Sequence, residues 1–207
     1  MNKTFVVASI ENSWHQSPQL AEQLILQIKM FGGSAVLLDL SHANVSREIF
    51  RHLKSYADQL NLAVVATCSS KEKFEWIQEE QIKIHLLSND VIKKPVLCAS
   101  MVQTGIPALV PFDGGKDFPL GDDFKNVKYL QNVGSTNELP SSFEGSLVGI
   151  LDHSSNGEAS TLAVKNGCKI IIKNYCLDKT NYNPGFIDCT DLLELRKKLN
   201  KVEMGLQ

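Results

Sequence analysis

The chain has 207 residues, 43% of them hydrophobic and 21% charged, and its formal net charge is −2 at pH 7. These values are typical of a folded globular protein and exclude a disordered or collagen-like chain. The nearly balanced charge gives no electrostatic basis for binding nucleic acid or an anionic membrane surface. No apolar run approaches the roughly 20 residues of a membrane-spanning helix. We therefore expect a cytoplasmic protein with neither nucleic acid nor a membrane as partner.

Apolar runs and helical patterns alternate through the first part of the chain. Four apolar runs predict strands at 5–10, 35–40, 62–67 and 83–88. Helical spacing of apolar residues follows these runs, and a further helix is expected over 92–104. Serines at three of the helix starts are typical N-caps, namely Ser17, Ser46 and either Ser69 or Ser70. Successive strand–helix units predict a parallel sheet with right-handed crossovers.

The second half of the chain is less regular. A strand is predicted over 106–112, and its two prolines favour an edge position or an irregular strand. The segment 113–145 is rich in Gly, Pro, Asp and Asn and contains one further strand, 127–133. Long loops of this kind are typical of lids, binding loops or insertions between lobes. A strand–helix–strand unit over 147–173 and a helix over 191–202 complete the pattern.

Together these elements predict a three-layer α/β sandwich with a mainly parallel sheet of about six to eight strands. We expect a single domain over 1–207, with a loop-rich segment near 105–145 where the chain could divide into two lobes.

Polar residues follow the predicted strands, and the carboxyl ends of parallel strands converge on one crevice. This edge therefore predicts a site for a small polar ligand, held by hydroxyl groups and backbone amides. The same residue types also serve as helix caps and turn formers, so a purely structural role stays open. The candidate ligand-binding residues are Asn12, Ser13, Ser41, His42, Ser154, Ser155, Asn156 and Glu158.

The candidate catalytic residues are Asp152, His153 and Lys173. A carboxylate beside an imidazole at a strand end suits general acid–base chemistry. Adjacent strand residues point to opposite faces, however, so Asp152 and His153 need not act together. Asp39 lies inside an apolar run, and a buried carboxylate needs partners, which makes it either a functional group or a loop cap.

Several familiar motifs are missing. The first strand runs into ASIENS rather than GxGxxG, and neither GxxxxGK[ST] nor GxSxG is present. No HxxxH or CxxC spacing occurs, so no metal site is predicted, and the sequence names no cofactor. The five cysteines are expected to be structural thiols: Cys68, Cys98, Cys168, Cys176 and Cys189.

The stretch SSNGEASTLAVKNGCKIIIKN, residues 154–174, resembles the nucleotide-binding part of the amino acid kinase family. In that family a polar loop with an acidic residue precedes a helix and a strand that carries Lys or Thr-Asp. Asn156 or Glu158 corresponds to the acidic position, and Lys173-Asn174 to the strand end. The family's phosphate-binding glycine and lysine motifs are absent from the first two strands, so the resemblance implies a degenerate relative.

The sequence therefore predicts a small-ligand-binding or regulatory α/β protein, with a small molecule or nucleotide as ligand. The first alternative is a small-molecule kinase or transferase acting at the strand ends. The second is an assembly subunit that works by forming a homo-oligomer.

Overall fold

The computed structural model describes residues 3–11, 13–14, 17–42, 45–114, 119–120, 124–179 and 185–206. Within these residues nine parallel strands carry the fold: β1 (Phe5–Ser9), β2 (Ala35–Asp39), β3 (Ala63–Cys68), β4 (Ile84–Leu87), β5 (Ala108–Phe112), β6 (Val127–Val133), β7 (Leu147–Asp152), β8 (Ile170–Tyr175) and β9 (Phe186–Ile187).

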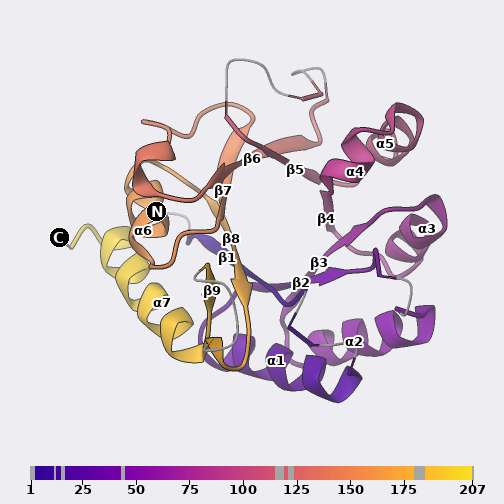
Figure 1. Cartoon of the computed structure of the whole chain (residues 1–207), viewed down its shortest axis with the longest axis horizontal. Coiled ribbons are helices and arrows are strands. Elements are labelled where there is room, and N and C mark those ends of the chain that lie inside the picture. The colour runs from indigo at the N-terminus through magenta and orange to yellow at the C-terminus, as the bar shows by residue number, and fades with distance from the viewer. Residues whose placement is uncertain are drawn as a thin grey trace.

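The sheet closes on itself. Strands β1 to β8 are hydrogen-bonded in sequence order, and β8 also pairs with β1 from Phe5↔Ile170 to Ser9↔Asn174. The result is a closed barrel of eight parallel strands (Figure 1), with the short β9 attached to the end of β8. Strands β7 and β8 approach each other closely at Gly149 of β7, because a Cβ there would lie 2.1 Å from the carbonyl oxygen of Ile170.

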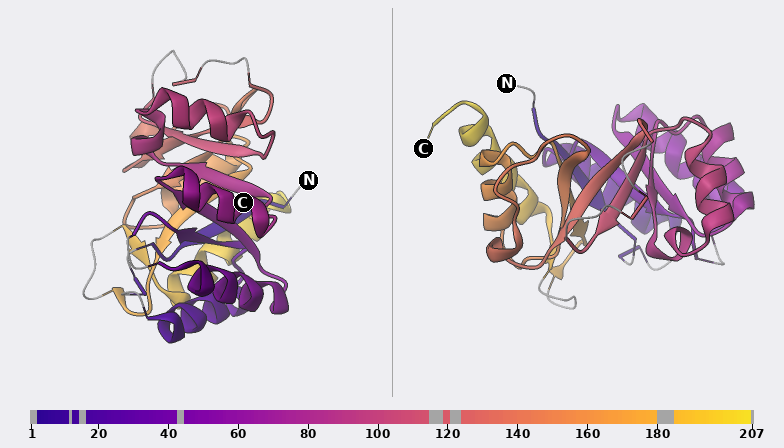
Figure 2. Two further views of the ribbon diagram at one scale, coloured as in Figure 1. Left: turned by 90° about the vertical axis from the view of Figure 1, so that its right-hand side faces the viewer. Right: turned by 90° about the horizontal axis from the view of Figure 1, so that it is seen from above.

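Helices surround this barrel (Figures 1 and 2). They are α1 (Pro18–Met30), α2 (Arg47–Gln59), α3 (Lys71–Glu79), α4 (Asn89–Ile92), α5 (Pro95–Val102), α6 (Glu158–Lys165) and α7 (Cys189–Glu203), with the 3₁₀ turn η1 (Thr136–Glu138). No α-helix follows β5 or β6 among the described residues. In the described part of the chain, no helix is long and apolar enough to cross a membrane.

The α/β class and the parallel sheet are confirmed, but the predicted sandwich is wrong. A sandwich needs an open sheet, whereas the pairing of β1 with β8 removes both edges. The strand predicted over 106–112 with two prolines is also not at an edge, because it corresponds to β5, which lies between β4 and β6. Strands β5 and β6 belong to the same barrel as their neighbours, although they lie in the loop-rich segment 105–145.

The buried apolar residues form two groups, which explains why the strands read as continuously apolar. One group fills the space between the strands and the surrounding helices, and the other fills the barrel interior. The interior group consists of Val7, Ala35, Leu37, Val65, Leu86, Leu109, Leu130 and Ile172. Most of the barrel is therefore a packed core, and any ligand must bind at one of its ends.

Candidate active site

A pocket of about 460 Å³ lies at the carboxyl ends of the barrel strands. Its position follows from the two-residue period of a strand, since residues i and i+2 point to the same side. Two residues beyond the interior Val7, Leu37 and Val65 come Ser9, Asp39 and Thr67, which line the pocket. The same step leads from Leu86, Leu130 and Ile172 to Ser88, Asn132 and Asn174.

The pocket has an apolar floor and a polar rim. Leu37, Leu86, Pro111, Leu151 and Ile172 form the floor. The rim is made of Ser9, Glu11, Asp39, Ser41, Thr67, Ser88, Asn89, Asp90, Asn132, His153 and Asn174. No lysine or arginine occurs among the described residues that line the pocket. The site thus presents carboxylates, amides, hydroxyls and one imidazole to a ligand.

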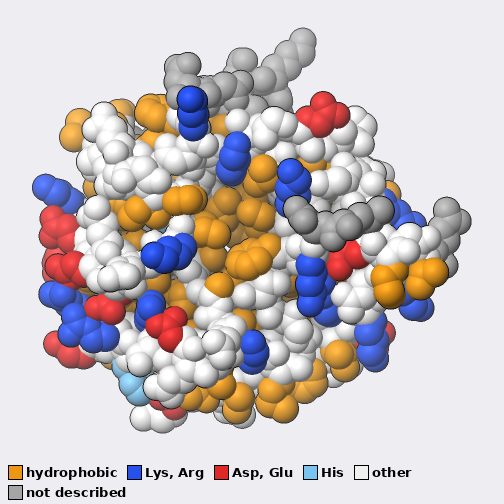
Figure 3. Space-filling view, turned by 180° about the vertical axis from the view of Figure 1, so that it is seen from behind, with side chains coloured by type: hydrophobic (Ala, Val, Ile, Leu, Met, Phe, Trp, Pro, Cys, Tyr) orange, Lys and Arg blue, Asp and Glu red, His pale blue; other side chains and the backbone are white. Residues whose placement is uncertain are grey.

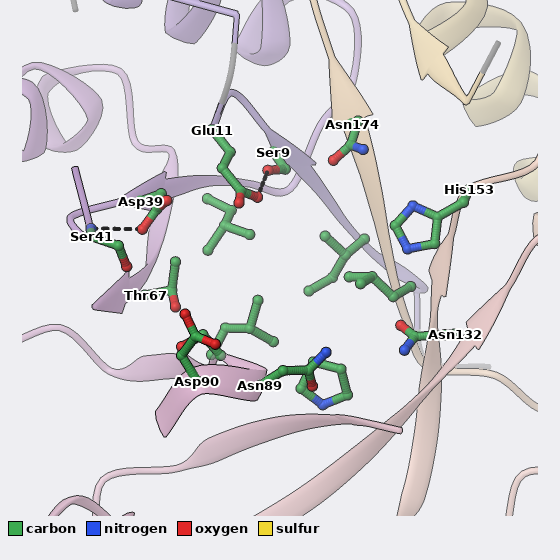
Figure 4. A pocket seen from close by; sticks show the side chains of 16 residues that line it. Ser9, Glu11, Asp39, Ser41, Thr67, Asn89, Asp90, Asn132, His153 and Asn174 are labelled. Atoms are coloured by element: carbon green, nitrogen blue, oxygen red, sulfur yellow. Dashed lines mark hydrogen bonds between the residues drawn. The ribbon is translucent and has the colours of Figure 1, made fainter. Parts of the chain in front are cut away.

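The rim has two chemically different sides (Figure 4). Asp39, Thr67 and Asp90 lie on one side, on or just after β2, β3 and β4. Asn132 and His153 lie on the opposite side, on β6 and just after β7. One side therefore carries negative charge, and the other offers uncharged hydrogen-bonding groups.

Glu11 extends from the end of β1 into the pocket, where Ser9 donates a hydrogen bond to it at 3.5 Å. Burial raises the pKa of the Glu11 carboxyl above its usual value, and the nearby charge of Asp39 raises it further. His42 and the Ser9 hydrogen bond oppose these effects. A carboxyl group with a raised pKa is suited to hold and donate a proton.

Asp39 is 7% exposed and lies beside Glu11 at the end of β2. The backbone amide of Ser41 donates to its Oδ1 at 2.8 Å, and His42 Nε2 lies 3.4 Å from its Oδ2. Within the described chain, no lysine or arginine forms an ion pair with this buried carboxylate. The nearby Lys73 instead donates to the carbonyl oxygen of His42, at 2.6 Å.

His153 points into the pocket from the end of β7 (Figure 4). Burial lowers the pKa of its imidazole, an effect that Asp152 opposes and Lys173 supports. The ring is therefore neutral at pH 7, with one nitrogen available as a proton acceptor.

Three lining side chains have buried polar atoms without a partner in the described chain: Thr67 Oγ1, Ser88 Oγ and Asn132 Oδ1. Thr67 is only 5% exposed. Buried polar atoms are nearly always hydrogen-bonded, so these three mark positions where a ligand or water completes the site.

Asp152 and Lys173 lie outside this pocket, because they alternate with the inward-facing Leu151 and Ile172. Both side chains are at most 1% exposed, and Lys173 Nζ lies 3.2 Å from Asp152 Oδ1. Lys173 also donates to the carbonyl oxygen of Ser154 at 2.7 Å. Burial lowers the pKa of the Lys173 ammonium, and Asp152 opposes this shift.

The other predicted ligand-binding residues are divided between several places. Ser41 lines the pocket, and His42 adjoins it through Asp39. Ser13 donates to the carbonyl oxygen of Tyr175 at 2.5 Å. Ser154 donates to Asp152, and Glu158 begins α6 outside the pocket. Ser155 and Asn156 line a separate hollow of about 270 Å³ beside α7, and Asn12 lies outside the described residues.

The candidate residues named from the sequence leave out Glu11 as well as Ser9, Asp90 and Asn132, all of which line the pocket. Ser9 and Asn132 lie within strands rather than after them, so a search for residues that follow strands passes over them. Counting in steps of two from the buried layer would have found both. Among the described residues, no group of three or more His, Cys, Asp or Glu side chains is arranged to hold a metal ion.

Comparison with known proteins shows similarity in structure but not in sequence. No known family and no curated protein matches the sequence. The fold is similar to an N-acetylneuraminic acid (sialic acid) synthetase from Leptospira borgpetersenii, with 15% identity and a TM-score of 0.82 over 98% of this chain and 85% of that one.

Two further barrels are similar over 99% of this chain. A spore coat polysaccharide biosynthesis protein from Bacillus subtilis has 15% identity and a TM-score of 0.81, and 70% of it is covered. A truncated 3-deoxy-D-arabino-heptulosonate 7-phosphate synthase from Thermotoga maritima has 12% identity and a TM-score of 0.78, and 89% of it is covered. At these identities the similarity establishes the barrel fold alone.

These barrels correct two predictions made from the sequence. The resemblance to amino acid kinases is wrong, because the segment 154–174 belongs to a closed barrel whose structural neighbours are synthases. The predicted function of a kinase-like regulatory protein is wrong for the same reason, together with its kinase and assembly alternatives. The chain shares its fold with synthase and aldolase enzymes.

Proposed function

We propose that the protein is an enzyme of the synthase or aldolase type, which makes or breaks a carbon–carbon bond next to a carbonyl group. One observation carries the proposal: Glu11 and His153 face the same pocket, with pKa values shifted toward each other. Paired groups of this kind are typical of sites that move protons.

The lining favours a polyhydroxylated substrate without phosphate. Carboxylate, amide and hydroxyl groups hydrogen-bond sugar hydroxyls well. Phosphate needs cationic or clustered amide donors, and the described lining contains neither lysine nor arginine. The names of the similar barrels support the sugar class, since they include a sialic acid synthetase and a polysaccharide biosynthesis protein.

The chemistry follows from the two groups. His153 takes a proton from the carbon next to the substrate's carbonyl, while Glu11 gives a proton to the carbonyl oxygen. The resulting enol attacks a second carbonyl carbon, and a carbon–carbon bond forms. The enol proton returns to Glu11, and His153 gives its proton to the new hydroxyl oxygen. Cleavage is the same sequence in reverse.

Asp152 and Lys173 have a positioning role in this proposal. They lie on the far side of β7 and β8, where their charges act on the pKa of His153 in opposite directions. The pair also fixes the backbone of Ser154, the residue that follows His153.

Proton exchange with solvent tests the function without knowledge of the natural substrate. In D₂O, the enzyme should replace the carbon-bound protons of dihydroxyacetone and D-fructose with deuterium, as read by proton NMR. We expect Glu11→Gln and His153→Gln each to slow this exchange by about 100-fold or more. Glu75→Gln and His52→Gln are the matched controls on the outer helices and should exchange at the wild-type rate.

Two results would overturn the proposal. One is exchange at the uncatalysed rate with both ketoses. The other is catalysed exchange that survives in both pocket variants, because the proton transfer would then take place elsewhere.

A further inference from the structure

The acidic side of the pocket lacks a counter-charge. Asp39 is almost fully buried, and burying a carboxylate is costly unless a cation and hydrogen bonds compensate it. Its Oδ1 has one backbone donor, and its ion-pair partner in the described chain is His42, whose side chain is 42% exposed. The buried charge thus has no permanent cationic partner in the described chain.

A second, independent feature lies next to Asp39. Thr67 is its neighbour in the β2–β3 ladder, and the Thr67 hydroxyl is buried, directed into the pocket and unpartnered. Asp90 adds a further carboxylate on the same side of the rim (Figure 4). Two carboxylates and a hydroxyl oxygen therefore surround one region of the pocket.

These three groups match the hydrogen-bonding needs of one chemical group. An alkylammonium carries a positive charge and three N–H donors, and it accepts nothing. A sugar hydroxyl would also bind, but it would leave the charge of Asp39 uncompensated. A phosphate or carboxylate would be repelled by Asp39 and Asp90 at this position.

We infer that the substrate carries a free amino group, which binds between Asp39, Thr67 and Asp90 while its carbonyl end faces Glu11 and His153. The inference rests on the proposed function and narrows its substrate class to unacetylated, unphosphorylated amino sugars. Acetylation would remove both the charge and two of the three donors.

Calorimetric titration of the whole chain with four related sugars tests this inference. The probes are D-glucosamine, N-acetyl-D-glucosamine, D-glucose and D-glucose 6-phosphate. We expect D-glucosamine to bind at least tenfold more tightly than the other three. In Asp39→Asn and in Thr67→Val this preference should fall to about twofold or less.

Matched controls separate loss of recognition from loss of folding. Asp58→Asn and Thr190→Val change exposed residues outside the pocket and should keep the full preference. Thr67→Val is nearly isosteric and removes an unpartnered buried hydroxyl, so its melting temperature should equal or exceed that of the wild type.

The outcomes distinguish this inference from the proposed function. The inference is overturned if all four sugars bind equally, or if the preference for D-glucosamine persists in Asp39→Asn and Thr67→Val. Neither result affects the proposed function, which proton exchange tests separately. A strong preference for D-glucosamine without exchange on any ketose supports the amine site and overturns the proposed reaction.

Discussion

His85 illustrates how a single residue can tie stability to pH. It lies on the helix-facing side of β4, 1% exposed, with its ring 5.2 Å from that of Phe74. Neither ring nitrogen has a partner in the described chain. Burial lowers the pKa of this histidine to about 4, so the folded protein holds it uncharged.

The free energy of unfolding should therefore decrease in mild acid. Between pH 6.5 and about 4 the unfolded chain binds a proton at His85 that the folded chain does not. The loss from this one group is at most about 1.4 kcal/mol per pH unit. We expect His85→Leu to remove this part of the pH dependence, as measured by urea unfolding at pH 7, 5.5 and 4.5. If the free energy of unfolding of His85→Leu fell as steeply between pH 7 and 4.5 as that of the wild type, this assignment would be wrong.

At the residue scale, the sequence predicted the helix caps better than the residues that line the pocket. The serine caps are confirmed, since Ser17, Ser46 and Ser70 accept from the amides of Leu20, Ile49 and Lys73. Caps depend on neighbouring residues and can be read locally. The pocket instead combines residues from eight strands, and only their register shows which side chains meet.

At the scale of elements, the buried pair of Asp152 and Lys173 joins β7, β8 and the start of α6. Asp152 accepts from Ser160 of α6 and from both the amide and hydroxyl of Ser154. Removing one member of such a pair leaves an uncompensated buried charge. The pair therefore holds the strand that presents His153.

Asp152→Ala should lower the free energy of unfolding by about 3–5 kcal/mol. The control Asp58→Ala disrupts the exposed pair with Lys54 and should change stability by less than about 1 kcal/mol. Chemical denaturation followed by circular dichroism measures both. A variant Asp152→Ala with wild-type stability but no proton exchange would instead assign Asp152 a direct role in catalysis.

Element types were largely predictable because periodicity and caps are local signals. The apolar runs predicted every barrel strand, including β6 within the loop-rich segment. The position of β5 was not predictable in this way. Its prolines suggested an edge, and a closed barrel has no edges.

For the whole molecule, closure was the feature that the sequence could not show. An open sheet and a barrel share the same strand–helix alternation, and they differ in whether the first strand meets the eighth. That contact joins Phe5–Ser9 to Ile170–Asn174, which lie 165 residues apart in the chain of 207. The resemblance to amino acid kinases was wrong for the same reason, because it relied on the single segment 154–174 and not on how the strands pair.

Charged residues lie at both ends of the barrel. Seen from behind, hydrophobic side chains gather in the middle of one face, with Lys and Arg as well as Asp and Glu around them (Figure 3). Lys3, Lys83, Lys128 and Lys169 lie at or near the amino ends of strands, whereas the opposite end carries Glu11, Asp39 and Asp90. Such a charge distribution favours the approach of a cationic substrate to the pocket.

The pH dependence of proton exchange tests the central claim most directly, namely that Glu11 and His153 move protons in the barrel mouth. Activity requires His153 without its proton and Glu11 with one. Because the pKa of His153 lies below 6.5 and that of Glu11 above 4.5, we predict a bell-shaped rate profile for dihydroxyacetone with its maximum on the acid side of neutrality. His153→Gln should lose the acid limb of the bell. A rate that rises continuously through pH 8, or a bell unchanged in His153→Gln, would contradict the account.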